Sequence, residues 1–177
     1  MSARSTIVHW GSTAAERAEP FPCDHLLAAP NDTLFRAVDV DAPAETTFRL
    51  LCQLRAAPYS YDKLDNFGRR SPQTLTPGLE QLAVGQRVQT IFKLVDFEPG
   101  RSLTIWSSGR IFGRVACTYR ADPVDAGRSR IVVKLLTSYP PGALHLRLLR
   151  KLLPLGDLVM MRRQLLNLKG LAEQADQ

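Results

Sequence analysis

The sequence contains little cysteine, few aromatic residues and no long hydrophobic run. Its three cysteines, Cys23, Cys52 and Cys117, are far apart, and no two have the spacing of a metal site or a redox pair. No stretch approaches the roughly 18 apolar residues that a membrane-spanning helix needs, and residues 1–19 lack the apolar run of a signal peptide. The sequence therefore predicts a cytoplasmic protein with reduced thiols.

Motifs that define several common enzyme classes are also missing. The chain has no Gly-x-Ser-x-Gly nucleophile elbow, no P-loop and no Gly-x-Gly-x-x-Gly nucleotide fingerprint. Only Cys23-Asp24-His25 places two metal-ligating side chains close together, whereas a zinc site needs three or four ligands. We therefore expect no bound metal, no cofactor and no serine-hydrolase chemistry.

Basic residues outnumber acidic residues. The 177 residues include 23 Lys and Arg against 17 Asp and Glu, which gives a formal net charge of +6. This balance favours acidic partners in general, among them nucleic acid, anionic lipid and acidic small ligands. Because the basic residues follow no nucleic-acid-binding motif and aromatic residues make up only 7% of the chain, nucleic-acid binding is not expected.

Length and composition predict one globular domain. A hydrophobic fraction of 45% and a charged fraction of 23% are ordinary for a folded protein, and a chain of this length can bury a core of its own. Residues 1–32 show no periodicity and are interrupted by three prolines, which predicts an extension that lies over the domain. The domain itself is expected to occupy residues 33–177.

Hydrophobic periodicity predicts a helix between the first strand and a run of further strands. Residues 33–41 alternate apolar and polar side chains, as a half-buried strand does. Apolar residues at helical spacing follow within residues 42–57, and a second short helix is expected at 59–67. Short turns between successive strands predict an antiparallel sheet, with its further strands at residues 86–95, 103–107, 113–120 and 131–139.

The end of the chain is predicted to be helical. The basic, leucine-rich segment 142–153 forms one short helix in this prediction, and Pro154-Leu155-Gly156 interrupts it. A final helix from Asp157 to about Gln174 carries its apolar residues at spacings of three and four. At roughly 27 Å, that helix is long enough to cross a whole sheet.

This order of elements resembles the helix-grip fold of the START-like (SRPBCC) superfamily, which includes the birch-pollen-allergen (Bet v 1-like) proteins and the polyketide cyclase/dehydrase group. The resemblance covers about residues 33–174 and rests on the segments Asp41–Phe48, Val84–Gln86, Phe97–Thr104 and Arg162–Lys169. It implies an α+β fold in which a curved antiparallel sheet of six or seven strands wraps around a long C-terminal helix. Two short helices follow the first strand, and residues 70–76 are the place for a seventh strand.

The resemblance also implies a class of function. In this superfamily the space between sheet and helix is a deep, mostly apolar cavity that holds lipids, quinones or polyketide intermediates. The first expectation is therefore binding of a hydrophobic or amphipathic small molecule. A polyketide cyclase or dehydrase that uses the same cavity is the alternative, so the sequence leaves open whether the protein is an enzyme. Polar side chains converging deep in the cavity would favour the enzyme, and a wholly apolar cavity would favour a carrier.

The candidate cavity residues are aromatic side chains of the predicted strands and second helix, together with the apolar stripe of the last helix. For each of them, core packing or a solvent-facing position is the competing interpretation. No residue is assigned a catalytic role. The candidates are Tyr59, Tyr61, Phe92, Trp106, Tyr119, Tyr139, Leu158, Met161 and Leu165.

The segment 142–153 places Arg147, Arg150 and Lys151 around a stripe of leucines. A basic amphipathic helix can contact an anionic membrane or the anionic head of an amphipathic ligand. A core-packing helix with solvated basic residues is the competing interpretation. A further alternative function is therefore an accessory protein that acts at a membrane surface or on a protein partner, and the oligomeric state stays open.

Overall fold

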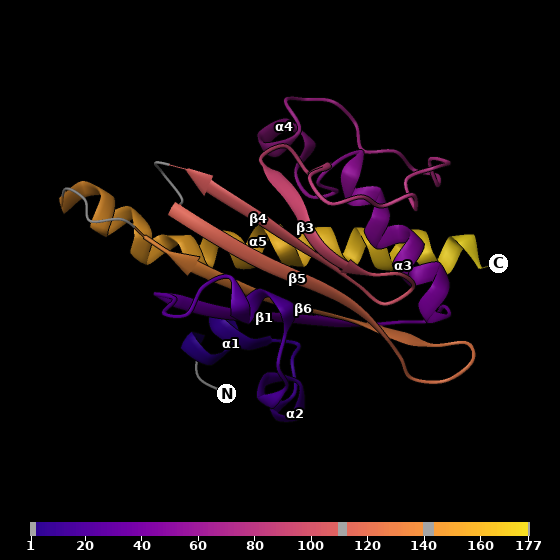
Figure 1. Ribbon diagram of the computed structural model, residues 1–177, viewed down its shortest axis with the longest axis horizontal. Helices are drawn as coiled ribbons and strands as arrows, with labels where there is room; N and C mark the ends of the chain where they lie inside the picture. Colours follow the sequence, from indigo (N-terminus) through magenta and orange to yellow (C-terminus); the bar gives the residue numbers. More distant parts are fainter. Residues whose placement is uncertain (1–2, 110–112, 140–143, 177) are drawn as a thin grey trace.

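A six-stranded antiparallel sheet lies between two layers of helices in the computed structural model (Figure 1). The structure describes residues 3–109, 113–139 and 144–176, and the side chains of the last range from Arg150 onward. This architecture confirms the predicted α+β helix-grip fold with its long C-terminal helix. In spatial order the strands are β1 (Asp32–Val40), β6 (Ser129–Ser138), β5 (Gly113–Pro123), β4 (Ser102–Gly109), β3 (Phe92–Glu98) and β2 (Arg87–Val88).

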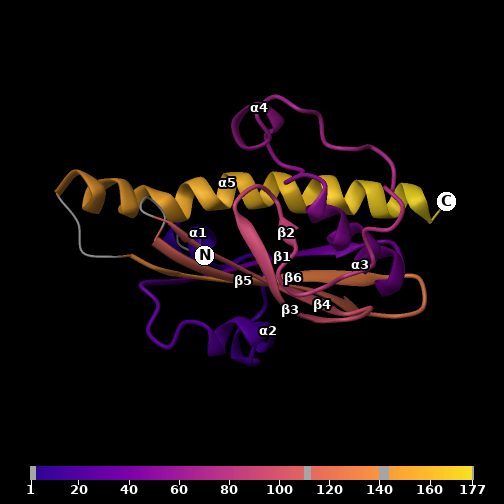
Figure 2. The same ribbon diagram turned by 45° about the horizontal axis from the view of Figure 1, so that its top comes forward.

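One face of the sheet is covered by α5 (Leu144–Ala175), which runs along its length in both views (Figure 1, Figure 2). Beside it lie α3 (Ala44–Cys52) and the 3-10 helix η2 (Gln53–Arg55), whereas α4 (Asp62–Asp65) belongs to a loop that stands clear of the sheet. Successive strand side chains face opposite sides, so alternate residues point toward these helices. The resulting main core includes Leu34, Val40, Leu103, Ile105, Val133 and Leu168.

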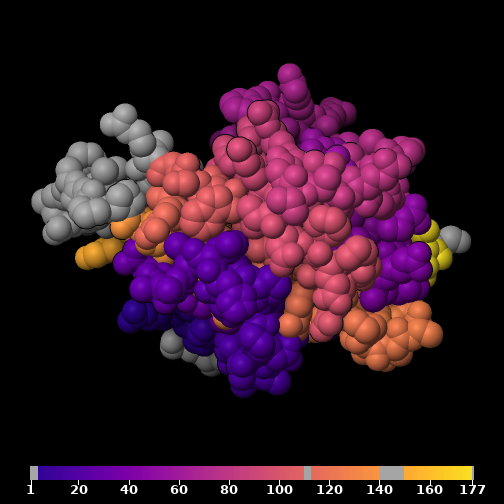
Figure 3. All heavy atoms as spheres, in the orientation of Figure 1, coloured from indigo at the N-terminus to yellow at the C-terminus, as the bar shows by residue number. Residues whose placement is uncertain are grey.

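The N-terminal segment covers part of the opposite face, which we call the outer face (Figure 3). Its α2 (Ala14–Ala18) and the 3-10 helix η1 (Pro22–His25) belong to this face, although the sequence showed no periodicity. Its first helix, α1 (Ala3–His9), instead lies beside β1 and packs Val8 against the main core. A second apolar cluster joins the N-terminal segment to the sheet, and sheet residues on both faces are therefore buried. This cluster contains Phe21, Cys23, Leu27, Phe35, Ala37, Ala116, Val132 and Leu136.

Charged side chains of the sheet hold the N-terminal segment in place. Arg130 pairs with Glu16 at 2.5 Å, and Arg120 of β5 pairs with Glu19 at 2.7 Å. Lys134 of β6 pairs with Asp24 at 2.6 Å. These contacts tie residues 16–24 to the sheet. The boundary between an extension at 1–32 and a domain at 33–177 stays a prediction.

The predicted single strand at residues 86–95 is wrong, because the chain reverses within it. The two-residue strand β2 pairs with the start of β3, with Arg87 opposite Lys93. Gln89 lies between them with a left-handed backbone (φ 48°), and its N–H donates to the carbonyl of Leu54 at 2.7 Å. The turn is thus anchored by a residue 35 positions upstream, which the alternating pattern does not reveal.

Two further expectations about the elements are also wrong. Pro154 and Gly156 do not interrupt the C-terminal helix, which continues from Leu144 to Ala175 with Pro154 inside it. A proline in a helix interior removes a hydrogen bond and costs about 3 kcal/mol. Packing of the long helix along the sheet outweighs that local preference. Residues 70–76, all of them described, form no strand.

We predict that the Arg130–Glu16 pair stabilises the fold only while Glu16 is ionised. Burial by itself raises the pKa of Glu16, but hydrogen bonds from Arg130 and from the Thr13 backbone bring it below its usual value. Glu16→Gln keeps the helix cap and removes the charge, and should lower the free energy of unfolding by about 1–2 kcal/mol at neutral pH. Because a lowered carboxyl pKa adds stability that is lost as pH falls through it, the difference from wild type should shrink below about pH 4.

Urea unfolding at neutral and acidic pH measures both effects. Glu98→Gln is the matched control, because Glu98 pairs with Arg101 at 3.5 Å on the surface, where ion pairs contribute little. An unfolding free energy of Glu16→Gln equal to that of wild type at neutral pH would show that the pair does not hold the N-terminal segment.

Candidate functional site

A cavity of about 550 Å³ lies between the inner face of the sheet and α5. Its wall is mostly apolar, with Ile105, Val115 and Leu135 from the strands and Met160 and Met161 from α5. The cavity also reaches the surface, because several residues of its wall are exposed to solvent. These features match the general form of a small-molecule site.

A hydrogen-bonded group of polar side chains forms one part of the cavity wall. The Tyr119 hydroxyl donates to Gln164 Oε1 at 2.8 Å and accepts from Gln89 Nε2 at 3.0 Å. Gln164 Nε2 in turn donates to the carbonyl of Pro58 at 2.6 Å. The group therefore joins β5, the β2–β3 turn, α5 and the chain after η2. Its polar atoms satisfy one another, which removes the cost of burying them beside an apolar cavity.

Tyr119 and its neighbour Cys117 are held in their neutral forms. Burial raises the pKa of the Tyr119 hydroxyl well above its usual value, and the nearby Cys117 adds to the shift. Burial also raises the pKa of the Cys117 thiol well above its usual value. Because a thiol reacts as its thiolate, Cys117 is a poor nucleophile despite its position in the cavity wall.

An ion pair closes the wall between β1 and α5. Arg36 is fully buried, and its guanidinium lies 2.7 Å from the Asp157 carboxylate. The same guanidinium donates to the carbonyls of Val8 in α1, at 3.1 Å, and of Phe35, at 2.8 Å. Asp157 belongs to the cavity wall, and burial raises its pKa although Arg36 opposes the shift.

Two more polar positions lie on the wall. The Ser60 hydroxyl donates to the Asp65 carboxylate, whose second oxygen is buried without a hydrogen-bond partner among the described residues. Tyr139 donates to Asp32 at 2.8 Å, and burial raises the pKa of this tyrosine to about 12. Asp65, the last residue of α4, and Tyr139, which directly follows β6, thus add polar groups to the cavity wall.

The structure separates the candidate cavity residues into two groups. Phe92, Tyr119, Tyr139 and Met161 line the cavity. The remaining five are not part of its wall. They are Tyr59, Tyr61, Trp106, Leu158 and Leu165.

The positions of these five side chains explain why they do not line the cavity. Trp106 packs against the cluster on the outer face, because its neighbour Ile105 faces the cavity and side chains alternate along β4. Leu165 is fully buried in the main core, Leu158 is half-buried on another side of α5, and the Tyr61 ring lies under the Arg163 guanidinium at 5.3 Å.

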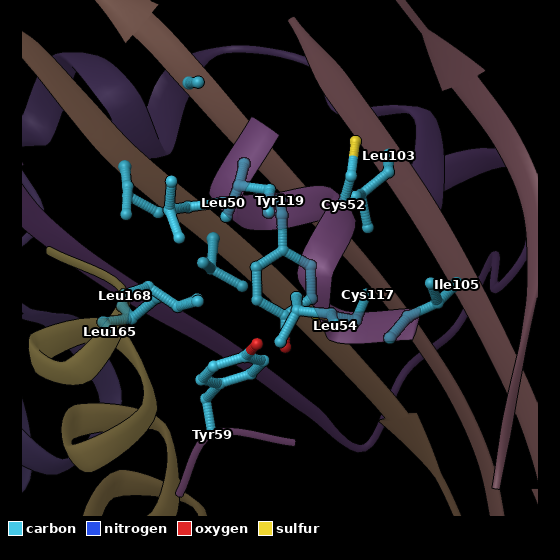
Figure 4. Close-up of a cluster of buried hydrophobic side chains, with 14 of the residues drawn as sticks. Leu50, Cys52, Leu54, Tyr59, Leu103, Ile105, Cys117, Tyr119, Leu165 and Leu168 are labelled. Atoms are coloured by element: carbon cyan, nitrogen blue, oxygen red, sulfur yellow. The ribbon is translucent and has the colours of Figure 1, made fainter. Parts of the chain in front are cut away.

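Tyr59 is buried in the core, with its side chain pointing inward toward Tyr119 (Figure 4). Its backbone is left-handed (φ 56°), and its hydroxyl has no hydrogen-bond partner among the described residues. Burial, with a smaller contribution from Asp62, raises the pKa of Tyr59 to about 12. Tyr59 is therefore a residue of the main core and is not part of the cavity wall.

The basic residues of segment 142–153 have separate positions. The Arg150 guanidinium lies over the ring of Tyr139 at 5.3 Å, and Lys151 is exposed. The side chain of Arg147 lies outside the described residues. In the segment Cys23-Asp24-His25, which carries possible metal ligands, Cys23 is buried on the outer face and Asp24 forms an ion pair with Lys134.

The polar wall residues Gln89, Gln164, Asp157 and Asp65, and the Arg36 partner of Asp157, were not predicted. Nothing in the local sequence marks Gln89, Gln164 or Asp157, because each acquires its role from partners far away in the chain. Gln89 is 30 residues from Tyr119, and Gln164 is 45 residues from it. The predicted cavity residues are aromatic or apolar, and residues of the packed core have the same character. Residue type alone therefore does not distinguish the cavity from the core.

We predict that Asp157 stabilises the fold by neutralising Arg36. Asp157→Ala leaves the guanidinium buried without its counter-ion and should lower the free energy of unfolding by about 3–5 kcal/mol. The double variant Arg36→Met/Asp157→Leu removes both charges and should recover most of this loss. Urea unfolding of the three proteins measures the effect. Equal stability of Asp157→Ala and wild type would contradict the prediction.

Within the described residues, no helix combines the length and apolar character needed to cross a membrane. The chain matches no protein-family model and no curated protein in sequence.

Solved structures with the same fold exist. The Zhui aromatase/cyclase from Streptomyces sp. R1128 matches with a TM-score of 0.53 and 18% identity, over 82% of this chain and 95% of that chain. A protein from Thermus thermophilus matches with a TM-score of 0.53 and 16% identity, over 82% and 99% of the two chains. A protein from Mesorhizobium loti matches with a TM-score of 0.52 and 16% identity, again over 82% and 99%. At these identities the likeness concerns the fold, which this chain shares with an aromatase/cyclase.

Proposed function

We propose that the protein binds a largely apolar small molecule in the cavity between its sheet and α5. The observation that carries the proposal is the cavity itself, about 550 Å³ in volume, within the range of about 300–1,000 Å³ that is usual for ligand sites. An apolar wall without a ligand lacks the dispersion contacts that a filled core makes. A ligand of matching shape supplies those contacts and gains binding free energy from leaving water.

The polar groups of the wall favour a ligand with few polar atoms. Tyr119, Gln89 and Gln164 already satisfy one another. Hydrogen bonding to a ligand is then left mainly to Asp157 and Asp65. The fold likeness to the Zhui aromatase/cyclase supports aromatic, polyketide-like molecules within this class, beside lipids and quinones.

The direct test is to release and identify the ligand. Native mass spectrometry of protein purified without detergent, followed by organic extraction, should show one small apolar or amphipathic molecule per chain. The neutral dye Nile red serves as a probe of the emptied cavity. A protein that carries no molecule and leaves Nile red fluorescence unchanged would contradict ligand binding.

We predict that Gly156→Phe blocks the cavity without unfolding the protein. Gly156 lines the cavity on α5, and a Cβ at this position meets no atom within 4 Å. Removing a helix-interior glycine also favours the helix. Nile red binding should weaken about tenfold or more, because even a small part of the apolar contact is worth about 1.4 kcal/mol.

Gly170→Phe is the matched control, since Gly170 lies on the same helix, has the same open space at Cβ and does not line the cavity. Fluorescence titration of both variants compares the sites. Equal binding by Gly156→Phe and Gly170→Phe would place the probe outside the cavity.

A second candidate function is acid–base catalysis on a bound ketone, as in a polyketide cyclase or dehydrase. The observation that favours it is the pair of carboxyl groups, Asp65 and Asp157, on the wall of an apolar cavity. Asp157 is held as the counter-ion of Arg36, whereas one oxygen of Asp65 is buried without a hydrogen-bond partner among the described residues and can accept a proton from a ligand.

We predict for this second function that the protein accelerates exchange of the methyl protons of 2-acetylnaphthalene for deuterium in D₂O. A carboxylate would take the proton from the methyl carbon to leave an enolate, and a deuteron from solvent would replace it. Asp65→Asn should lower the catalysed rate about tenfold or more. Asp62→Asn is the control, because the Asp62 carboxylate is bound by Ser71 outside the cavity. A rate equal to that of buffer alone would exclude this function for aryl ketones.

A further inference from the structure

Three large apolar side chains at the opening of the cavity project into solvent. Leu64 is 76% exposed, Phe67 is 83% exposed and Ile91 is 55% exposed, and all three also line the cavity. They come from two segments, the loop around α4 and the β2–β3 turn. We call these three residues the apolar rim. Apolar groups that gather at the mouth of an apolar cavity mark a surface that gains free energy when it leaves water.

Positive charges lie beside the apolar rim. Lys63, Arg69 and Arg70 are exposed on the same loop as Leu64 and Phe67. The same loop holds two carboxylates, Asp62, which is hydrogen-bonded to Ser71, and Asp65, which is hydrogen-bonded to Ser60. Because serine donors leave the charge of a carboxylate in place, residues 59–70 have a net charge of +1, and their three basic side chains are exposed.

The β2–β3 turn contributes Ile91 to the opening. Arg87 and Lys93, which pair with each other on β2 and β3, are exposed but alternate with the inward-facing Val88 and Phe92, so they lie on the other face of these strands. Two separate segments of the chain thus present apolar side chains at one opening, and the α4 loop adds basic ones. This combination complements a surface that is negatively charged outside and apolar beneath.

The shape of the α4 loop is held by its own hydrogen bonds. The N–H of Gly68 donates to the carbonyl of Asp62 at 2.7 Å, and Asn66 Nδ2 donates to the carbonyl of Arg69 at 2.7 Å. Phe67 and Gly68 both have left-handed backbones, at φ 52° and 78°. That conformation disfavours a side chain such as phenylalanine. The outward position of Phe67 is therefore built into the loop, which stands clear of the sheet and α5 in both views (Figure 1, Figure 2).

We propose that the apolar rim and its basic neighbours dock on the surface of an anionic lipid bilayer, so that the cavity opens toward the membrane. The inference rests on the proposed function, since a docked cavity matters only if it exchanges an apolar ligand with the bilayer. Leu64, Phe67 and Ile91 enter the interface, while the basic side chains of the α4 loop meet lipid phosphates and carboxylates. The docking residues lie in the α4 loop and the β2–β3 turn, and the segment 142–153 is not needed for the contact.

Co-sedimentation with vesicles tests the docking. The protein should bind phosphatidylcholine vesicles that contain phosphatidylserine and should bind pure phosphatidylcholine vesicles much more weakly. High salt should reduce the binding, because it screens the charges. Arg69→Ser/Arg70→Ser should weaken the partitioning about tenfold or more, since each basic residue near an anionic surface contributes about fivefold. Leu64→Ser/Phe67→Ser should weaken it to a similar degree by removing the inserted side chains.

Two matched controls identify the surface. Val124→Ser removes a 55% exposed valine from the β5–β6 turn, and Leu155→Ser/Val159→Ser removes exposed apolar residues of α5 that do not line the cavity. Both controls should sediment like wild type. Wild-type protein that ignores anionic vesicles, or rim variants that bind like wild type, would overturn the proposal. Loss of binding in the α5 control alone would assign the contact to α5 and overturn it as well.

Nile red binding in the absence of vesicles separates this inference from the proposed function. Arg69→Ser/Arg70→Ser should bind the dye like wild type, because neither arginine lines the cavity. Normal dye binding without vesicle binding would refute the docking and leave the ligand site standing. Vesicle binding by a protein that binds no apolar molecule would refute the proposed function, and with it the delivery of a ligand from the membrane.

Discussion

The fold depends on a buried guanidinium that joins three elements. Arg36 of β1 is paired with Asp157 of α5 and donates to the Val8 carbonyl of α1. A buried charge without its partner costs several kcal/mol, so these elements must reach their positions together. The long helix is thereby held at one place along the sheet. Asp157 also belongs to the cavity wall, so the same ion pair places one wall residue of the helix beside β1.

The N-terminal segment packs on both sides of β1. Its residues Phe21, Cys23 and Leu27 cover the outer face, whereas α1 lies beside β1, packs Val8 against the main core and accepts a hydrogen bond from Arg36. A sheet that is packed on both faces resists deformation, because dense packing leaves little room for side chains to shift. The inner face of the sheet therefore holds a cavity, whereas the outer face is packed against the N-terminal segment.

Some parts of the fold could be predicted because they follow from local patterns. Alternation along residues 33–41 and 131–139 identified β1 and β6, and helical spacing identified α5 from Asp157 onward. The same local rules failed where contacts with distant residues determine the backbone conformation. Gln89 turns the chain within an alternating stretch because Leu54 and Tyr119 hold it, and Pro154 stays inside α5 because the helix packs along the sheet. Trp106 and Tyr119 are equally aromatic, and only the strand register places one outside and the other at the cavity.

The sequence by itself determined the class of fold, since the order of strands and helices and the apolar face of each element are local properties. A mostly apolar cavity was an implication of the resemblance to the helix-grip fold, and the polarity of its wall was left open. Tertiary structure alone decided which residues meet there. Tyr119, Gln89 and Gln164 become one hydrogen-bonded group, and Arg36 finds Asp157, only when segments 30 or more positions apart are brought together by burial. The physical reason is that a side chain's chemistry is set by its neighbours in space, and the sequence lists only its neighbours along the chain.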